Sequence, residues 1–310
     1  MQAAFVFPGQ GSQSIGMLSN LAENFSCVTE TFAEASSVLG YDLWQLVSNG
    51  PEADLNQTYR TQPAMLAAGI ASWRVWQQQA NFQPHYLAGH SLGEYTALVA
   101  SDALNFQDAI KLVAQRGELM QQAVPEGEGA MAAILGLDDA VVMKICDEAS
   151  QIGVVEAVNF NSPGQIVIAG RAEAVQQAIT LASDAGAKRA LLLPVSVPSH
   201  CALMRPAADK LALALSEVEI TLPTVPVIHN TTARQAADAS EIRELLARQL
   251  YSPVRWVESV QFLADQGVDT LVECGPGKVL AGLAKRIDKT LVAQPLFDTT
   301  SLEKTRQLVG

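Results

Sequence analysis

The segment Tyr86–Ala100 reads YLAGHSLGEYTALVA, and it decides the fold class of the chain. Its first four residues are apolar, as in a short buried strand, and Leu92–Ala100 has the composition of a helix. Two glycines, Gly89 and Gly93, enclose the three residues between them, so the chain is expected to turn sharply there. A strand, a sharp turn and a helix in this order predict an α/β protein.

The same pattern extends toward both ends of the chain. Ala3–Phe7 (AAFVF) is predicted to be a buried strand that ends at the turn Pro8-Gly9-Gln10-Gly11. Thr270–Cys274 is predicted to be a second strand ending at a glycine-rich turn, and Val225–His229 a third. The segments between them have helical patterns, which we expect at 62–79, 106–123, 203–218, 241–250, 257–266 and 279–286.

The middle of the chain changes character. A helix capped by Asp138 is expected to run to Ser150, and a second helix over 171–185 is expected to end at Gly186. Strands are expected around them at 130–137, 154–160, 165–169 and 190–195. This β-α-β-β-α-β order predicts a ferredoxin-like small domain at 128–196, inserted into a discontinuous α/β domain formed by 1–127 and 197–310.

Composition excludes several classes of protein. The chain has 310 residues, of which 49% are hydrophobic and 17% charged, so it can bury a large core and is not disordered. Its formal net charge of −12 argues against nucleic-acid binding. The sequence starts without a basic signal-peptide segment, and no apolar run approaches a membrane span. Well-separated cysteines without C-x-x-C spacing indicate a reduced cytoplasm and no zinc ribbon.

Gly89–Gly93 (GHSLG) fits G-x-S-x-G, the sequence of a nucleophile elbow, and it lies between a predicted strand and a predicted helix. Ser91 is therefore the candidate nucleophile, and the alternative is a purely structural strand-to-helix turn. The N-terminus of the following helix, including the N–H of Leu92, would face a developing oxyanion. The context favours covalent catalysis by the serine.

A serine nucleophile needs a general base, and the chain offers four histidines. His90 adjoins the serine, where neighbouring side chains diverge, and His85 precedes a strand and so lies at the opposite edge of the sheet. His200 lies in a loop between a strand and a helix and is the first candidate. His229 ends a strand, which brings it to the same edge as the elbow, and it is the second candidate.

The turn around Gln10 follows the first strand and is expected at the same sheet edge as Ser91. A backbone N–H from this turn would complete an oxyanion hole. A phosphate-binding loop is the competing interpretation, but G-x-x-x-x-G-K-[ST] is absent and no lysine precedes residue 111. Arg116 lies in a predicted helix, and the residues alone favour a surface charge there.

Several short motifs, in a fixed order and spanning nearly the whole chain, point to one enzyme family. They are FVFPGQGSQ at 5–13, GHSLGEY at 89–95, QRG at 115–117, NFNSPGQ at 159–165, VSVPSH at 195–200, QLYSP at 249–253 and ECGPG at 273–277. With these motifs the chain resembles the malonyl-CoA:acyl carrier protein transacylases of bacterial type II fatty acid synthesis.

The resemblance implies a fold and a set of site residues. The fold would be an α/β-hydrolase-like large domain with the ferredoxin-like insert. Arg116 would be a specificity residue, because a guanidinium pairs with the free malonyl carboxylate and a buried one disfavours uncharged acyl groups. The other implied roles are nucleophile (Ser91), base (His200), orientation of the histidine in place of an acid (Gln249), oxyanion hole (Gln10 and Leu92) and support of the acyl site (His90 and Asn159).

The resemblance also implies an activity. Malonyl would pass from malonyl-CoA, through a malonyl-serine ester, to the phosphopantetheine thiol of acyl carrier protein in a ping-pong reaction. No metal and no bound cofactor are expected, and we expect a cytoplasmic monomer of fatty acid biosynthesis with no nucleic-acid or membrane partner. Two alternatives stay open: a serine hydrolase or thioesterase on the same core, and a non-catalytic subunit that only docks carrier protein.

The uneven charge of the chain suggests where a carrier protein docks. Acyl carrier proteins are typically acidic, as is this chain, so docking requires a local basic surface. Between residues 185 and 210 four basic residues face a single acid, and the same holds between 278 and 289. Lys188, Arg189, Lys285 and Arg286 are the candidate docking residues.

Overall fold

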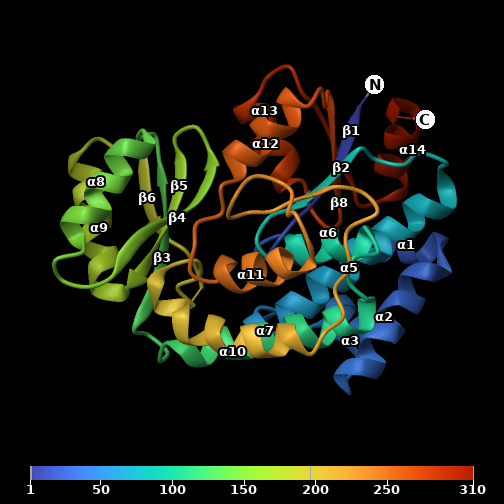
Figure 1. Ribbon diagram of the computed structural model, residues 1–310, viewed down its shortest axis with the longest axis horizontal. Coiled ribbons are helices and arrows are strands. Elements are labelled where there is room, and N and C mark those ends of the chain that lie inside the picture. The colour runs from blue at the N-terminus through green and yellow to red at the C-terminus, as the bar shows by residue number, and fades with distance from the viewer. Residues whose placement is uncertain (1, 196, 310) are drawn as a thin grey trace.

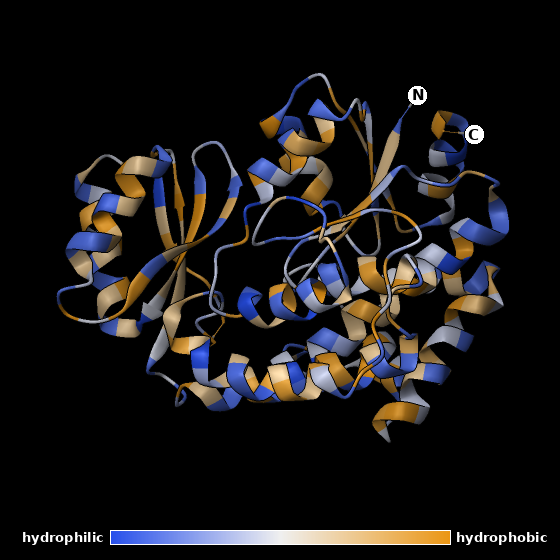
Figure 2. Cartoon of the chain, in the orientation of Figure 1, coloured by the Kyte–Doolittle hydropathy of each residue, from blue (hydrophilic) through white to orange (hydrophobic). Residues whose placement is uncertain are grey.

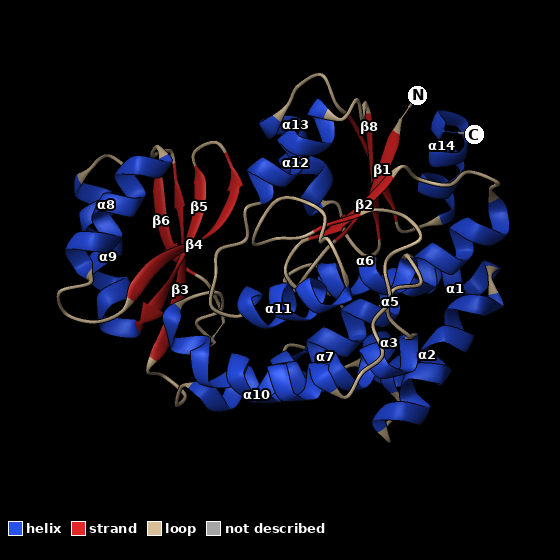
Figure 3. Cartoon of the chain, viewed as in Figure 1, coloured by secondary structure: helices blue, strands red, loops and turns tan. Residues whose placement is uncertain are grey.

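Two β-sheets of different kinds organise the chain, and each carries its own helices (Figure 1). The computed structural model describes residues 2–195 and 197–309. One sheet is parallel with five strands, and the other is antiparallel with four. Figure 3 shows the two sheets apart from each other, with helices around both. The predicted α/β class is therefore confirmed as a mixed α/β protein.

The strands of the parallel sheet are β1 (Ala3–Phe7), β2 (Tyr86–Gly89), β7 (Val227–Ile228), β8 (Thr270–Cys274) and β9 (Val292–Leu296). Their order is β7-β2-β1-β8-β9, so β1 lies at the centre. The predictions for β1, β2 and β8 are confirmed residue for residue. The strand predicted at 225–229 shrinks to β7, next to Pro226, which has no N–H to donate. The sequence analysis missed β9, whose Pro295 is tolerated because β9 is an edge strand.

Helices cover both faces of the parallel sheet, and further helices pack against these. They are α1 (Ser19–Asn24), α2 (Ser26–Leu39), α3 (Leu43–Asn49), α4 (Glu52–Leu55), α5 (Thr58–Gln79), α6 (Gly93–Ala100), α7 (Phe106–Ala123), α10 (Arg205–Ser216), α11 (Ala239–Gln249), α12 (Trp256–Asp265), α13 (Val279–Ile287) and α14 (Thr299–Val309). A short 3-10 turn, Ala202–Met204, leads into α10. Figure 2 shows the helices alternating between polar and hydrophobic residues, as expected when one face is buried. None of the helices in the described ranges is both long and apolar enough to span a membrane.

Alternate residues of β1 enter two separate cores, one on each face of the parallel sheet. Phe5 and Phe7 belong to the core that includes Trp73 of α5, and the ring centroids of Phe5 and Trp73 lie 5.6 Å apart. Ala4 and Val6 belong to the opposite core, which α12 and α13 cover. All of β1 is buried, as in a sheet covered on both sides.

The antiparallel sheet consists of β3 (Gly129–Leu135), β4 (Val155–Ser162), β5 (Gln165–Arg171) and β6 (Arg189–Leu192), with α8 (Asp139–Ala149) and α9 (Ala172–Asp184). Both helices pack in one apolar cluster with β3, β4 and β5. Three expectations need correction. Asp138 accepts no capping hydrogen bond through its side chain. The strand β4 continues to Ser162, through half of the predicted turn, and β6 ends at Leu192 rather than at 195.

The segment that follows α11 joins the two sheets. The N–H of Val254 donates to the Val158 oxygen at 2.8 Å, and the N–H of Phe160 donates to the Val254 oxygen at 3.0 Å. These bonds attach the chain to the edge strand β4, beside Asn159. The carboxyl ends of β1 and β2 face the same region, because Phe7 is in register with Gly89. The turns that follow these two strands therefore lie close together, on the side of the parallel sheet that faces the four-stranded antiparallel sheet, called the small sheet below.

Candidate active site

Ser91 occupies a sharp turn between β2 and α6, with a positive φ of 51°. Such a conformation is strained for a residue other than glycine and is typical of a nucleophile elbow. The two flanking glycines are required by space: a Cβ on Gly89 would lie 1.9 Å from the Gly93 carbonyl carbon, and one on Gly93 would lie 2.0 Å from the Phe7 oxygen. Only glycine fits at both flanking positions, and these two glycines allow the sharp turn that places Ser91 between β2 and α6.

The structure brings Ser91 and His200 together across 109 residues of sequence. Ser91 Oγ lies 2.8 Å from Nε2 of His200. Nδ1 of the same ring lies 2.7 Å from the main-chain oxygen of Gln249, at the end of α11. The expected orientation of the histidine by Gln249 therefore falls to a backbone carbonyl, while the side chain of Gln249 points elsewhere.

The His200 ring is buried and electrically disfavoured as a cation. Burial first, and then the nearby charge of Arg116, lower the pKa of His200 from 6.5 to about 3. The ring is therefore neutral near pH 7, with Nε2 free to accept the serine proton. Like Ser91, His200 has a positive φ, 68°, so both members of the pair sit on strained backbone.

Two backbone N–H groups lie beside the serine at the expected oxyanion hole. Gln10 follows β1 and Leu92 precedes α6, and both line the same cavity as Ser91. Neither N–H donates a hydrogen bond within the described part of the chain. Free donors at the N-terminal end of a helix are suited to an oxyanion.

Arg116 is buried, with 1% of its surface exposed, so the expectation of a surface charge from the residues alone is wrong. Its Nη1 donates to Gln62 Oε1 at 2.7 Å and its Nη2 to Gln249 Oε1 at 2.9 Å. The same Nη2 lies 3.5 Å from Ser91 Oγ. No salt bridge in the described ranges involves this guanidinium. A buried cation next to the nucleophile is thus open to an anion.

One cavity of about 120 Å³ collects these groups. It is narrow, which suits a short acyl group held close to the nucleophile. Its lining comes from the turns after β1 and β2, from α5 and α7, from β3 and β4 of the antiparallel sheet, and from residues just before His200. The lining residues are Gln10, Thr58, His90, Ser91, Leu92, Arg116, Met120, Met131, Asn159, Leu193, Val195, Val197, Ser199 and His200.

His90 and Asn159 both line the cavity but do not bond to each other. His90 Nε2 lies 2.8 Å from Asn161 Oδ1, and burial lowers the pKa of the ring, so His90 is neutral near pH 7. The Oδ1 of Asn159 is buried without a hydrogen-bond partner in the described residues. That oxygen is available to a group that enters the cavity. Asn161, two residues further on, was missed in the sequence analysis.

His229, the second candidate base, lies behind the elbow and does not line the cavity. Its Nδ1 is 2.7 Å from Oε1 of Glu94, and both side chains are 1% exposed. The adjacent Asn230 holds the elbow, because its Oδ1 accepts the N–H of Ser91 at 2.7 Å and its Nδ2 donates to the Gly89 oxygen. Sequence reasoning missed Glu94 and Asn230; the only available signal was an acid in the first turn of an otherwise apolar helix.

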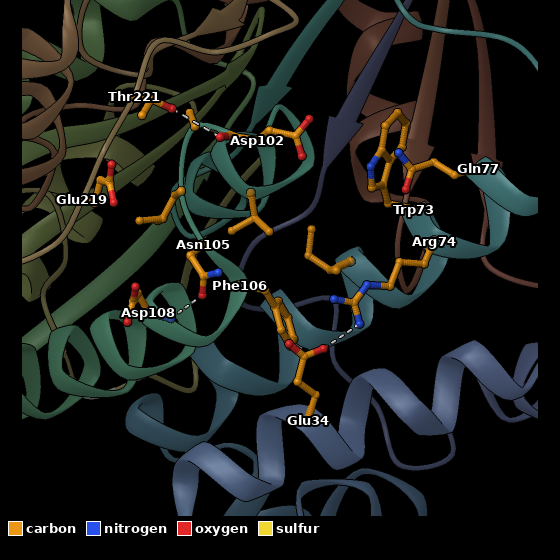
Figure 4. A pocket seen from close by; sticks show the side chains of 14 residues that line it. Glu34, Trp73, Arg74, Gln77, Asp102, Asn105, Phe106, Asp108, Glu219 and Thr221 are labelled. Atoms are coloured by element: carbon orange, nitrogen blue, oxygen red, sulfur yellow. Dashed lines mark hydrogen bonds and ion pairs between the residues drawn. The ribbon is translucent and has the colours of Figure 1, made fainter.

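A larger cavity of about 560 Å³ lies between α2, α5 and α7 (Figure 4). Its side chains include Glu34, which pairs with Arg74 at 2.9 Å, and the guanidinium of Arg74 stacks over Phe106. It contains no serine, cysteine or histidine among its lining residues. Nor do the described residues contain a cluster of three potential metal ligands.

The two basic clusters meet at one end of the small sheet. Leu135 is in register with Arg189 on one side and with Gln165 on the other. Gln165 Oε1 accepts a hydrogen bond from Arg286 Nη1 at 2.7 Å, which brings the end of α13 to the same row. Lys188, Arg189, Lys285 and Arg286 are all exposed. The register and this hydrogen bond therefore place Arg189 and Arg286, about a hundred positions apart in the sequence, at the same end of the antiparallel sheet.

Comparison with known proteins first identifies the general class of enzyme to which the chain belongs. The geometry is that of a serine and a neutral histidine in a small cavity with a buried arginine. The family described as "Acyl transferase domain" matches residues 4–302 of the chain. Except for Ala3 at the start of β1, this range includes both sheets, and it includes every residue of the cavity.

Individual relatives define the family more narrowly. The malonyl CoA-acyl carrier protein transacylase of Salmonella typhimurium is 59% identical over 301 residues, 97% of either chain. The crystal structure of an acyl carrier protein S-malonyltransferase from Vibrio cholerae is 60% identical, with a TM-score of 0.96 over 98% of this chain and 100% of that one. The chain belongs to the malonyl CoA-acyl carrier protein transacylase family.

A further solved structure contains a partner. It is a type II PKS acyl-carrier protein in complex with its malonyl-transacylase. The matched chain is 56% identical to this one, and the TM-score is 0.98 over 99% of this chain and 100% of that one.

Proposed function

We propose that this chain transfers malonyl from malonyl-CoA to the phosphopantetheine thiol of acyl carrier protein through an ester on Ser91. The observation that carries this function is the meeting of a nucleophile and a cation in one small cavity. Ser91 Oγ lies 2.8 Å from the neutral His200 and 3.5 Å from the buried Arg116. The spacing suits an acyl group whose reacting carbon and free carboxylate are only one carbon apart.

In the first half-reaction Ser91 Oγ attacks the thioester carbon of malonyl-CoA. His200 Nε2 takes the hydroxyl proton as the C–O bond forms, and the carbonyl electron pair moves to oxygen. The N–H groups of Gln10 and Leu92 stabilise that oxyanion. When the oxyanion collapses the C–S bond breaks, and the imidazolium returns its proton to the thiolate, so coenzyme A leaves as a thiol.

In the second half-reaction the carrier protein's thiol replaces coenzyme A. His200 takes the thiol proton while sulfur attacks the ester carbon, and collapse breaks the C–O bond and returns the proton to Ser91. Arg116 holds the malonyl carboxylate throughout by a charge-assisted hydrogen bond, with His90 and Asn159 supporting the acyl site. No step requires a metal or a bound cofactor.

We also infer the finer description of the fold. The strand order β4-β5-β3-β6, with α8 and α9 packed in one cluster, supports a ferredoxin-like domain at 128–196. The parallel sheet with its elbow after β2 supports an α/β-hydrolase-like domain built from 1–127 and 197–310. Both contribute to the cavity, which would make their junction the entry for substrates.

We propose that the basic surface formed by Lys188, Arg189, Lys285 and Arg286 docks the acidic carrier protein. The surface includes the junction of α13 with β5, where Arg286 bonds to Gln165. A positive patch on a chain of net charge −12 would overcome the long-range repulsion between two acidic proteins. The expectation of a monomer stays a prediction.

The acyl-enzyme is the direct test of this function. Mass spectrometry after mixing with malonyl-CoA should show one malonyl group on the peptide that contains Ser91. Ser91→Ala should remove the adduct, whereas Ser199→Ala, which changes another serine of the same cavity, should retain it. An adduct that persists in Ser91→Ala would refute the assignment. Steady release of free malonate without carrier protein would instead indicate a hydrolase.

A further inference from the structure

Glu94 is a buried carboxylate behind the nucleophile that does not line the cavity. It lies in the first turn of α6 and is 1% exposed. Its Oε1 is 2.7 Å from His229 Nδ1, and its Oε2 accepts the N–H of Asn230 at 2.9 Å. The same Oε2 accepts from Gln249 Nε2 at 2.8 Å. Three donors from two other elements therefore converge on one carboxylate, as a buried charge requires.

The Gln249 amide has one workable orientation in this environment. Its Nε2 faces three acceptors: Oε2 of Glu94, the main-chain oxygen of Ser91 at 3.0 Å and, at 3.5 Å, Oδ1 of Asn230. Its Oε1 faces a donor, Nη2 of Arg116. If the amide were flipped, its oxygen would face three oxygens and its NH2 group would face a guanidinium. Glu94 is the only charged group among these acceptors, so its bond to Nε2 is charge-assisted, as is the bond that Oε1 accepts from Arg116.

The guanidinium of Arg116 is held at both ends by neutral amides. Gln62 accepts from Nη1 and Gln249 accepts from Nη2. A carboxylate in either position would form an ion pair with the arginine and reduce its attraction for an incoming anion. The amide of Gln249 lies between Glu94 and Arg116. It therefore lets the position of Glu94 determine the position of the guanidinium, and it leaves the positive charge of Arg116 without an ion-pair partner.

We propose that Glu94 is a positioning residue for acyl selectivity. Its carboxylate fixes the Gln249 amide, and the amide in turn fixes the Arg116 guanidinium where the malonyl carboxylate binds. The inference rests on the role of Arg116 under the proposed function. Glu94 touches no substrate atom, and its effect on the reaction passes through Gln249.

Glu94→Gln preserves the shape of the side chain and removes its charge. The single amide oxygen would still accept from Gln249 and Asn230, but without a negative charge, and the new NH2 would face His229 Nδ1, which must change tautomer to accept it. We expect kcat/KM for malonyl-CoA to fall about tenfold, because a displaced guanidinium loses its substrate contact. Acylation by acetyl-CoA, which has no carboxylate to bind, should change much less. An equal fall for both substrates, or no fall for malonyl-CoA, would overturn the proposal.

Glu273→Gln is the matched control, measured with the other variants at pH 8, where Glu273, with a pKa raised by burial to about 7, is mostly ionised. Glu273 is also fully buried near the ends of the parallel strands, but it bonds to the N–H of Ala281 in α13 and not to Gln249. The malonyl-to-acetyl ratio of kcat/KM should stay at the parental value in this variant. A ratio that falls as far as in Glu94→Gln would mean that any lost buried carboxylate has this effect, and it would overturn the proposal.

A double-mutant cycle separates this inference from the proposed function. Arg116→Ala by itself tests the role of the arginine. If Glu94 acts through Arg116, adding Glu94→Gln to Arg116→Ala should leave the malonyl-to-acetyl ratio unchanged, whereas additive losses would contradict the proposed route. If Glu94→Gln does not fold, His229→Leu replaces it, because it removes one of the three donors to Glu94. The ratio should again fall, and an unchanged ratio would overturn the proposal.

Discussion

The main-chain oxygen of Gln249 lies 2.7 Å from Nδ1 of His200, where a serine hydrolase triad presents a carboxylate. A carbonyl oxygen only accepts hydrogen bonds, so Nδ1 carries the hydrogen and the lone pair of Nε2 faces Ser91 Oγ. A neutral carbonyl fixes this tautomer without contributing a negative charge. Burial and the charge of Arg116 oppose a charged ring, so the geometry and the lowered pKa of His200 agree.

The pH dependence of acylation should reflect this neutral histidine. With the His200 pKa lowered to about 3, kcat/KM for the malonyl-CoA half-reaction should stay flat as the pH falls from 8 to about 5. An ordinary histidine would lose activity about tenfold per pH unit below 6.5. Stopped-flow measurement of acyl-enzyme formation across this range is the test. If log kcat/KM instead falls by one for each pH unit below about 6.5, the lowered pKa of His200 is contradicted.

The same shift affects the stability of the fold. In the unfolded chain the imidazole takes up a proton near pH 6.5, whereas in the folded chain it does so only near pH 3. Protons therefore favour the unfolded state, and the stability contributed by neutral His200 is full above pH 6.5 and is lost as the pH falls toward 3. His200→Gln should lose less free energy of unfolding between pH 7 and pH 5 than the parent chain does.

Arg116→Ala should change the selectivity of the enzyme more than its folding. We expect kcat/KM for malonyl-CoA to fall about a hundredfold, since a buried substrate carboxylate would lose its charged partner. Acetyl transfer should stay level or rise, because an uncharged acyl group no longer leaves a guanidinium unpaired. Arg74→Ala, which removes a half-buried arginine at the distant cavity, should leave both rates unchanged. If kcat/KM falls equally for malonyl-CoA and acetyl-CoA, Arg116 does not determine acyl selectivity.

Local patterns explain why part of the site was predictable. Ser91 follows from a glycine-flanked turn between a strand and a helix, and the bounds of β1, β2 and β8 follow from short apolar runs. The group that accepts the hydrogen bond from His200 Nδ1 could not be predicted from local patterns, because it is a backbone carbonyl and any residue type could supply it. Glu94 and Asn230 are 136 positions apart and meet only through the sheet. The edge strand β9 was hidden by Pro295, which the sequence pattern reads as a break.

Asn230→Ala should destabilise the elbow. The substitution leaves the N–H of Ser91 and the oxygen of Gly89 without their partner, and Ser91 is already on strained backbone. Two unsatisfied groups should lower the free energy of unfolding by about 2–4 kcal/mol. Urea unfolding measures the loss, with Asn81→Ala at an exposed loop position as the control. If both variants unfold at the same urea concentration, Asn230 does not hold the turn.

Glu273→Gln should reduce the stability that the fold loses between pH 5 and pH 8. Burial raises the pKa of Glu273 from 4.5 to about 7, and its Oε1 has no partner among the described residues. A raised carboxyl pKa means that its contribution to stability is full below pH 4.5 and is lost as the pH rises through 7. Relative to the parent, the variant should therefore gain about 1–3 kcal/mol of unfolding free energy between pH 5 and pH 8. Thermal unfolding at the two pH values measures this difference, and a constant difference would mean that Glu273 titrates normally.

Reversing the charge at the end of α13 should weaken carrier-protein docking selectively. Lys285→Glu combined with Arg286→Glu would turn part of the basic surface negative opposite an acidic partner. KM for acyl carrier protein should rise about tenfold, and by less at high salt, because exposed charges are screened. The malonyl-CoA half-reaction should keep its rate, since Ser91, His200 and Arg116 are untouched.

The matched control for this charge reversal is Lys304→Glu, an exposed lysine of α14 on the side of the molecule away from the small sheet (Figure 1). It changes the net charge of the chain in the same direction but lies outside the basic surface. If Lys304→Glu raises KM for acyl carrier protein as much per charge as the α13 variant, the effect is long-range repulsion between two acidic proteins. If the α13 variant slows both half-reactions equally, these residues act on coenzyme A binding or on the fold. Only a selective rise in KM at α13 fits a docking surface.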